Sequence, residues 1–128
     1  MADPIVFIVD DDESVRKALK RLLRSSGLEA KAFASAEDFL SQCSTDAPTC
    51  LILDVRMPGM DGLELQEKLA KSGSTMPIIF ISAHEDAHTR EQAMKAGAMA
   101  FLKKPFEDQI LIEKVNSALS RMEDGPEP

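Results

Sequence analysis

Short runs of apolar residues alternate along the chain with longer segments in which apolar residues recur every three or four positions. The short runs are typical of strands covered on both faces, and the longer segments are typical of amphipathic helices. The pattern predicts strands at 5–9, 28–33, 50–53, 77–81 and 98–102. It predicts helices at 15–23, from Ser35 onward, and at 62–71, 86–96 and 107–122. Five strand–helix repeats indicate an α/β fold with a parallel sheet and helices on both faces.

The segment 28–33 differs from the other predicted strands, because apolar and polar residues alternate along it. Alternation is typical of a strand with one solvated face, whereas the other four runs are almost continuously apolar. We therefore expect residues 28–33 to lie at an edge of the sheet.

Polar residues follow four of the five predicted strands. They are Asp10, Asp11 and Asp12 after the first strand, Asp54 after the third, Ser82 after the fourth, and Lys103 and Lys104 after the fifth. The carboxyl ends of parallel strands meet at one edge of a sheet, so we expect these side chains to gather there. Two carboxylates about 4 Å apart repel by roughly 4 kcal/mol at an effective dielectric constant near 20, which favours a bound cation. Oxygen ligands suit Mg²⁺, and a carboxylate beside it is available as a nucleophile. The residues alone thus indicate a Mg²⁺-assisted phosphoryl site.

Composition narrows the possible functions. The chain has 128 residues, which fits one domain, and 22 acidic against 15 basic residues give a net charge of -7. This charge argues against direct binding of nucleic acid. The sequence has no signal peptide and no apolar run of about 20 residues, so we expect a cytoplasmic protein without a membrane partner. Cys43 and Cys50 lack metal-ligand spacing and are expected to be buried or half-buried, reduced thiols.

Four ordered motifs, IVDD, LILDVRMPGMDG, FISAH and FLKKPF, resemble the receiver domain of two-component response regulators. The resemblance covers residues 4–122, and RMPGMDGLEL and KKPFEDQIL are most similar to the NarL/FixJ-like subgroup. It implies a flavodoxin-like (CheY-like) doubly wound sheet of five parallel strands, in the order 2-1-3-4-5, with five helices. We expect residues 1–122 to form the receiver and 123–128 to be an acidic Pro/Gly tail or the start of a linker. In this subgroup a DNA-binding helix-turn-helix domain usually follows the receiver, and these 128 residues include none.

The resemblance assigns a role to each residue at the strand ends. Asp54 would accept a phosphoryl group from a sensor histidine kinase. The Mg²⁺ ligands would be Asp10, Asp11, Asp54 and the backbone carbonyl of Arg56. In the acidic run IVDDDES, only Asp10 and Asp11 would serve the metal. Asp12 and Glu13 are instead typical of a helix start, where backbone amides favour negative charge.

Three further residues complete the implied site. Ser82 would donate its hydroxyl to the phosphoryl oxygens, and Lys104, before an expected cis Pro105, would pair with the phosphoryl group. Phe101 stands where the family carries a switch aromatic, although a plain core role is the alternative. Arg56 and His84, two residues after Asp54 and Ser82, occupy positions that tune the lifetime of the phosphorylated state in this family.

The resulting hypothesis is a phosphorylation-dependent signalling switch. Phosphorylation would alter the face formed by the fourth helix, the fifth strand and the fifth helix, and so control a homodimer or an effector that regulates transcription. The alternative is a phosphatase or phosphotransferase with an aspartyl-phosphate intermediate. Such enzymes often place a second Asp two residues after the nucleophile, where this chain has Arg56. A nucleotide- or flavin-binding domain is disfavoured, because no G-x-G-x-x-G follows the first strand.

Overall fold

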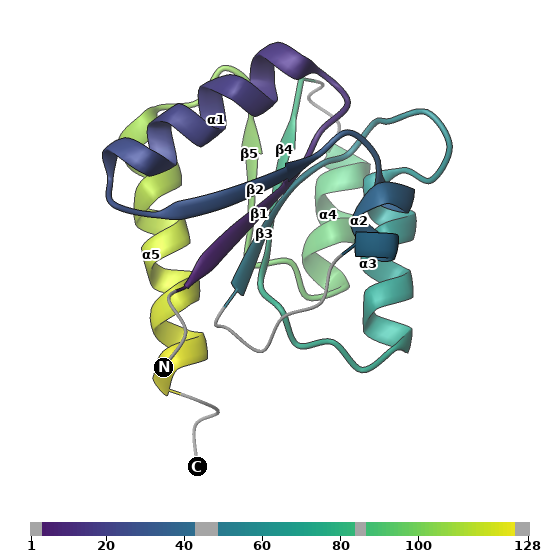
Figure 1. Cartoon of the computed structure of the whole chain (residues 1–128). Helices are drawn as coiled ribbons and strands as arrows, with labels where there is room; N and C mark the ends of the chain where they lie inside the picture. The colour runs from purple at the N-terminus through teal and green to yellow at the C-terminus, as the bar shows by residue number, and fades with distance from the viewer. Residues whose placement is uncertain (1–3, 43–48, 84–86, 125–128) are drawn as a thin grey trace.

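Strands and helices alternate along the part of the chain that the computed structural model describes, residues 4–42, 49–83 and 87–124 (Figure 1). The strands are β1 (Ile5–Val9), β2 (Glu29–Phe33), β3 (Thr49–Asp54), β4 (Ile78–Ser82) and β5 (Ala100–Lys103). The helices are α1 (Glu13–Ser25), α2 (Ala36–Gln42), α3 (Gly62–Lys71), α4 (Ala87–Lys95) and α5 (Asp108–Asp124). All five predicted strand–helix units are confirmed.

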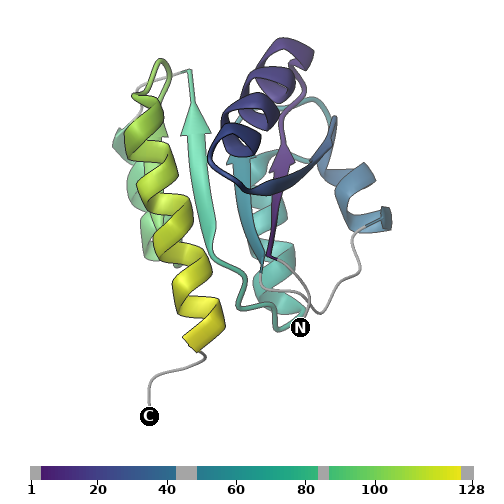
Figure 2. The same ribbon diagram turned by 60° about the vertical axis from the view of Figure 1, so that its left-hand side comes forward.

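The five strands form one parallel sheet in the order β2-β1-β3-β4-β5, which confirms the expected doubly wound, flavodoxin-like topology. β2 lies at the edge, as its alternating sequence predicts. Helices α1 and α5 cover one face of the sheet, and α2, α3 and α4 cover the other (Figures 1 and 2). Because all five strands are parallel, their carboxyl ends lie at a common end of the sheet.

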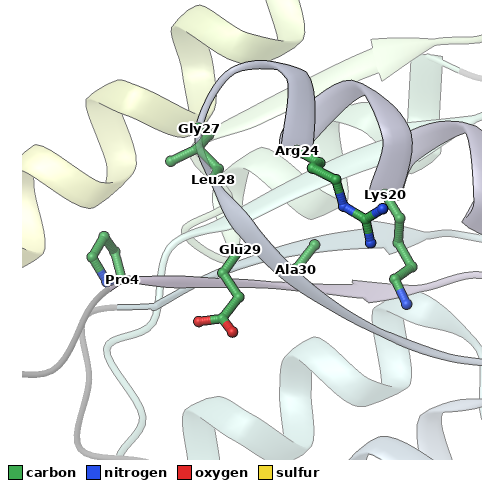
Figure 3. A pocket seen from close by; sticks show the side chains of 7 residues that line it. All are labelled: Pro4, Lys20, Arg24, Gly27, Leu28, Glu29 and Ala30. Atoms are coloured by element: carbon green, nitrogen blue, oxygen red, sulfur yellow. The ribbon is translucent and has the colours of Figure 1, made fainter.

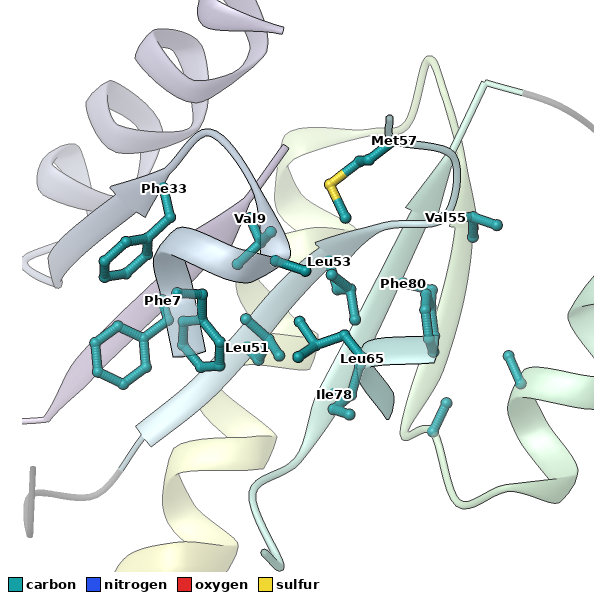
Figure 4. Packing of buried hydrophobic residues seen from close by; sticks show 14 of the residues in the cluster. Phe7, Val9, Phe33, Leu51, Leu53, Val55, Met57, Leu65, Ile78 and Phe80 are labelled. Atoms are coloured by element: carbon teal, nitrogen blue, oxygen red, sulfur yellow. The ribbon is translucent and has the colours of Figure 1, made fainter. Parts of the chain in front are cut away.

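Each face of the sheet has its own hydrophobic core. Phe7 and Val9 of β1 point toward α2–α4, whereas Val6 and Ile8 point toward α1 and α5, as the two-residue period of a strand requires. Figure 4 shows the first of these cores, in which aromatic and aliphatic side chains of the strands meet Leu65 of α3. These buried contacts hold the ends of the strands in place, so the residues that directly follow the strands are also held in fixed positions.

Most element boundaries differ from the sequence prediction by one or two residues, and two of these differences have a clear physical reason. β5 begins at Ala100 rather than at residue 98, because the Ala98 amide still donates to the Ala93 carbonyl at the end of α4, at 3.1 Å. α5 continues to Asp124, two residues beyond the predicted end at residue 122. Apolar periodicity predicts only the packed part of a helix, and Glu123 and Asp124 carry no apolar side chain.

Two findings bear on the remaining compositional expectations. Cys50 is buried in β3, and desolvation raises the pKa of its thiol to about 12, so this thiol is chemically quiet; Cys43 lies outside the described residues. In the described part of the chain, no helix has the length and apolar character to cross a membrane.

Candidate functional site

Three carboxylates converge at the carboxyl ends of neighbouring strands. Asp10 and Asp11 follow β1, Asp54 ends β3, and the two strands pair side by side with Val9 opposite Leu53. One oxygen atom from each carboxylate lies within 4.8 Å of the others. The structure thus brings together the three aspartates that the sequence placed at one edge of the sheet. Such a cluster of oxygen donors fits a hard divalent cation such as Mg²⁺.

Asp10 is fully buried, and protein groups occupy both of its carboxylate oxygens. Oδ1 accepts a hydrogen bond from the Asp12 amide at 2.9 Å, and Oδ2 forms an ion pair with the Lys104 ammonium at 3.0 Å. The Asp10 carbonyl oxygen accepts a further hydrogen bond from Arg16 Nη1 at 2.8 Å. Asp10 is therefore held rigidly, whereas the neighbouring Asp11 is exposed and reaches the cluster from the solvent side.

Asp54 is buried next to this pair, with 7% of its surface exposed. Its nearest cation is Lys104, whose Nζ lies 3.8 Å from Asp54 Oδ1. Burial, together with the charge of Asp10, raises the pKa of Asp54 to about 6, although Lys104 opposes the shift. Among the described residues, the Lys104 ammonium thus faces three carboxylates, and the excess negative charge favours an added cation.

Ser82 and Lys104 complete the edge on the other side of Asp54. Ser82 is buried at the end of β4, one residue beyond Ile81, which pairs with Asp54. The Lys104 amide donates to the Ser82 carbonyl at 2.7 Å, so the backbone ties the two residues together. Lys104 points toward the carboxylates while Lys103 is exposed, and the Lys104–Pro105 peptide is cis, as expected.

The other predicted residues lie around this cluster. Phe101 is buried beside Phe80, with ring centroids 6.1 Å apart, so its side chain belongs to the core on the α2–α4 face. The Arg56 side chain is exposed in the loop between β3 and α3. His84 lies outside the described residues.

The acidic run after β1 divides as predicted. Asp12 is the N-cap of α1, and its side chain accepts a hydrogen bond from the Ser14 amide at 2.8 Å. Glu13 occupies the first turn of the helix. Asp12 and Glu13 therefore stabilise a helix start, and Asp10 and Asp11 belong to the carboxylate cluster.

Sequence reasoning missed two residues that touch the site or its loops. Arg16 contacts Asp10, as described above, and Glu37 of α2 accepts a hydrogen bond from the Met60 amide at 3.0 Å. Arg16 lies four residues after the N-cap of α1, and this spacing only weakly indicates that its side chain would contact Asp10. Glu37 and Met60 are 23 residues apart on different elements, and no local pattern links them.

A cavity of about 720 Å³ lies elsewhere on the molecule, between α1 and the start of β2 (Figure 3). Lys20, Arg24, Glu29 and Pro4 line it. It opens beside the amino ends of β1 and β2, at the opposite edge of the sheet from the three aspartates. The cavity therefore has no part in the carboxylate site.

The strand order 2-1-3-4-5 is one of the two common orders of doubly wound sheets, and the acidic cluster lies beyond the carboxyl ends of the strands, where such sheets bind ligands. A family model described as the response regulator receiver domain matches residues 6–116. The chain therefore belongs to the response regulator receiver family of two-component systems, as the sequence motifs predicted.

Relatives of the chain include FixJ and other response regulators. Nodulation protein W of Bradyrhizobium diazoefficiens is 49% identical over 91% of this chain and 52% of its own length. The transcriptional regulatory protein FixJ of Azorhizobium caulinodans is 42% identical over 91% of this chain and 55% of its own length. The crystal structure of FixJ-N superposes with a TM-score of 0.86 at 41% identity, covering 94% of this chain and 97% of that one. The chain thus spans about half the length of the curated relatives it matches.

Proposed function

We propose that this receiver is switched by phosphorylation of Asp54. The observation that carries the proposal is a buried carboxylate at 7% exposure that shares one edge of the sheet with Asp10, Asp11, Ser82 and Lys104. The phosphoryl donor is the phosphohistidine of a sensor histidine kinase. An Asp54 carboxylate oxygen attacks the phosphorus atom, an O–P bond forms as the N–P bond breaks, and the electron pair of the N–P bond leaves with the imidazole.

Asp10, Asp11, Asp54 and the carbonyl of Arg56 would hold a Mg²⁺ ion, which would offset negative charge on the carboxylates and the phosphoryl oxygens. The clustering of three carboxylates within 4.8 Å supports this assignment. Lys104 pairs with Asp10 before transfer and is close enough to Asp54 to pair with its phosphoryl group afterwards. Ser82, which is buried at the end of β4, supplies a hydroxyl to the same group.

The output follows from a change in conformation. Phosphoryl contacts to Ser82 and Lys104 strain the ends of β4 and β5, and Phe101 of β5 transmits the change to the surface formed by α4, β5 and α5. This surface controls a homodimer or an effector domain. Because relatives about twice as long are named transcriptional regulatory proteins, we infer that the output is transcription, through a DNA-binding domain outside these residues. The alternative of an aspartyl-phosphate enzyme gains no support, because the position for its second acid holds the exposed Arg56.

Mass spectrometry of the intact protein after incubation with acetyl phosphate tests the proposal. The wild-type chain should gain one phosphoryl group in the presence of Mg²⁺ and none after chelation. The Asp54→Asn protein should gain none, and the Asp38→Asn protein, which changes an exposed carboxylate of α2, should behave as wild type. A folded wild-type protein without the adduct, or an adduct that persists in Asp54→Asn, would refute phosphorylation at this residue.

A further inference from the structure

One hydrogen bond joins α2 to the loop that links β3 and α3. The Met60 backbone amide donates to Glu37 Oε2 at 3.0 Å. This amide is the largest cause of the lowered pKa of the Glu37 carboxyl, so the side chain accepts the bond as a carboxylate at neutral pH. The contact is specific in shape as well, because a Cβ atom on Gly59 would lie only 2.7 Å from Glu37 Oε2. Gly59 also has a φ of +75°, which favours glycine, so two features of the loop suit this close approach.

The base of this loop is fixed by its own backbone. The Gly62 amide donates to the Val55 carbonyl at 2.8 Å, and the Val55 amide donates to Ile81 in β4 at 3.3 Å. Asp61 begins α3 with a reciprocal capping box formed with Glu64. These bonds join the two ends of residues 55–62 into a closed loop. The bond from the Met60 amide to Glu37 connects the middle of this loop to another helix.

Glu37 is presented from a rigid base. Its neighbours Ala36 and Phe39 are buried at 0% and 1% exposure. The ring of Phe39 packs edge-on against Phe7 and Phe33, with centroid separations of 5.5 Å in both pairs. The first turn of α2 therefore cannot shift without disturbing the core beneath β1 and β2. A carboxylate held in this way can restrain the loop that it contacts.

We propose that Glu37 is a positioning residue that holds the β3–α3 loop in the conformation that presents the Arg56 carbonyl to Mg²⁺. The inference rests on the proposed function, because it takes that carbonyl as a metal ligand. Arg56 lies two residues after Asp54, in the same closed loop as Gly59 and Met60. A carbonyl on an unrestrained loop must be ordered when the metal binds, and this ordering weakens affinity. Glu37 contributes that order in advance.

The test compares Glu37→Ala with two variants that remove the same charge. Glu37→Gln keeps a side-chain oxygen that can accept from the Met60 amide, and Asp38→Ala removes the adjacent exposed carboxylate of the same turn. Calorimetric titration with MgCl₂ should show Mg²⁺ affinity weakened about three- to tenfold in Glu37→Ala. This loss is smaller than is typical for buried residues that hydrogen-bond a metal ligand, because the Glu37 contact is exposed. Glu37→Gln and Asp38→Ala should match each other and lie within about twofold of wild type, since each loses only a distant charge.

Two further readouts separate positioning from general stability. In the metal-free protein, the Met60 amide should exchange with deuterium faster in Glu37→Ala than in Asp38→Ala. The phosphorylation rate with acetyl phosphate should need more Mg²⁺ in Glu37→Ala but reach the wild-type value at saturation. Equal Mg²⁺ affinity in Glu37→Ala and Asp38→Ala, or unchanged exchange of the Met60 amide, overturns this inference. The proposed function stands in that case as long as the wild-type protein is phosphorylated. If the wild-type protein binds no Mg²⁺, the metal assignment and this inference both fall.

Discussion

Replacing the proposed phosphoacceptor should make the protein more stable. Asp54 is 7% exposed, and burial and the charge of Asp10 raise its pKa from an ordinary value of 3.8 to about 6. Each pKa unit corresponds to about 1.4 kcal/mol, so holding Asp54 ionised in the folded state costs about 3 kcal/mol at pH 7.5, as an order of magnitude. Asp54→Asn keeps the size of the side chain and removes the charge. We expect it to raise the free energy of unfolding by about 1–3 kcal/mol in the absence of Mg²⁺.

The pH dependence gives this prediction a sign that can be checked. Because the folded-state pKa is the higher one, the penalty is absent below pH 3.8, grows between pH 3.8 and about 6, and is complete above that range. The advantage of Asp54→Asn should therefore be full at pH 7.5 and nearly absent near pH 4. Added Mg²⁺ should narrow the difference at pH 7.5, because it binds the wild-type carboxylates and stabilises that protein.

Urea unfolding followed by far-ultraviolet circular dichroism is the suitable assay, since the chain has no Trp and no Tyr. Glu113→Gln, at an exposed position of α5, is the matched control and should change stability by less than about 0.5 kcal/mol. The reasoning fails if Asp54→Asn is no more stable than wild type at pH 7.5. It fails equally if the gain is the same size near pH 4, because the gain would then not come from removing the charge.

Four other substitutions probe the residues that support the site. Asp12→Ala should lower the free energy of unfolding by about 1 kcal/mol, because the helix cap is lost, and should keep Mg²⁺-dependent phosphorylation. Asp11→Ala should stay folded but lose Mg²⁺-dependent phosphorylation. The opposite pattern in mass spectra and urea titrations would contradict our assignment of Asp11 to the site and Asp12 to the helix cap. Gln66→Ala should cost about 1–3 kcal/mol in the same titration, because the buried amide of this side chain bonds an α4 carbonyl at 3.0 Å; a cost below 0.5 kcal/mol would mean that water replaces the bond. Gly62→Ala should lower the free energy of unfolding by about 1–3 kcal/mol and slow phosphorylation by acetyl phosphate, because the added Cβ atom would overlap the Asp54 carbonyl oxygen. A wild-type rate would show that α3 moves away from Asp54 without affecting the site.

The order of the sheet shows how far the sequence pattern reaches. Alternation along 28–33 predicted an edge strand, and β2 lies at the edge. The full order 2-1-3-4-5 followed from the resemblance carried by the four motifs, since periodicity does not determine which buried strands are neighbours. α4 illustrates the limit on the helix side: its apolar residues are few, and the structure leaves Met94 40% exposed while Ala93 is buried.

By itself, the sequence determined the five strand–helix units and the residues that follow each strand. Parallel connection then required Asp10, Asp54, Ser82 and Lys104 to meet at one edge, because every strand runs the same way. Only the tertiary structure decided which groups touch there. Lys104 pairs with Asp10 across 94 residues of chain, and burial beside Asp10 raises the pKa of Asp54. Glu37 of α2 accepts a hydrogen bond from the Met60 amide in the loop between β3 and α3. Contacts of this kind depend on burial and on the relative placement of distant elements, and local periodicity specifies neither of these.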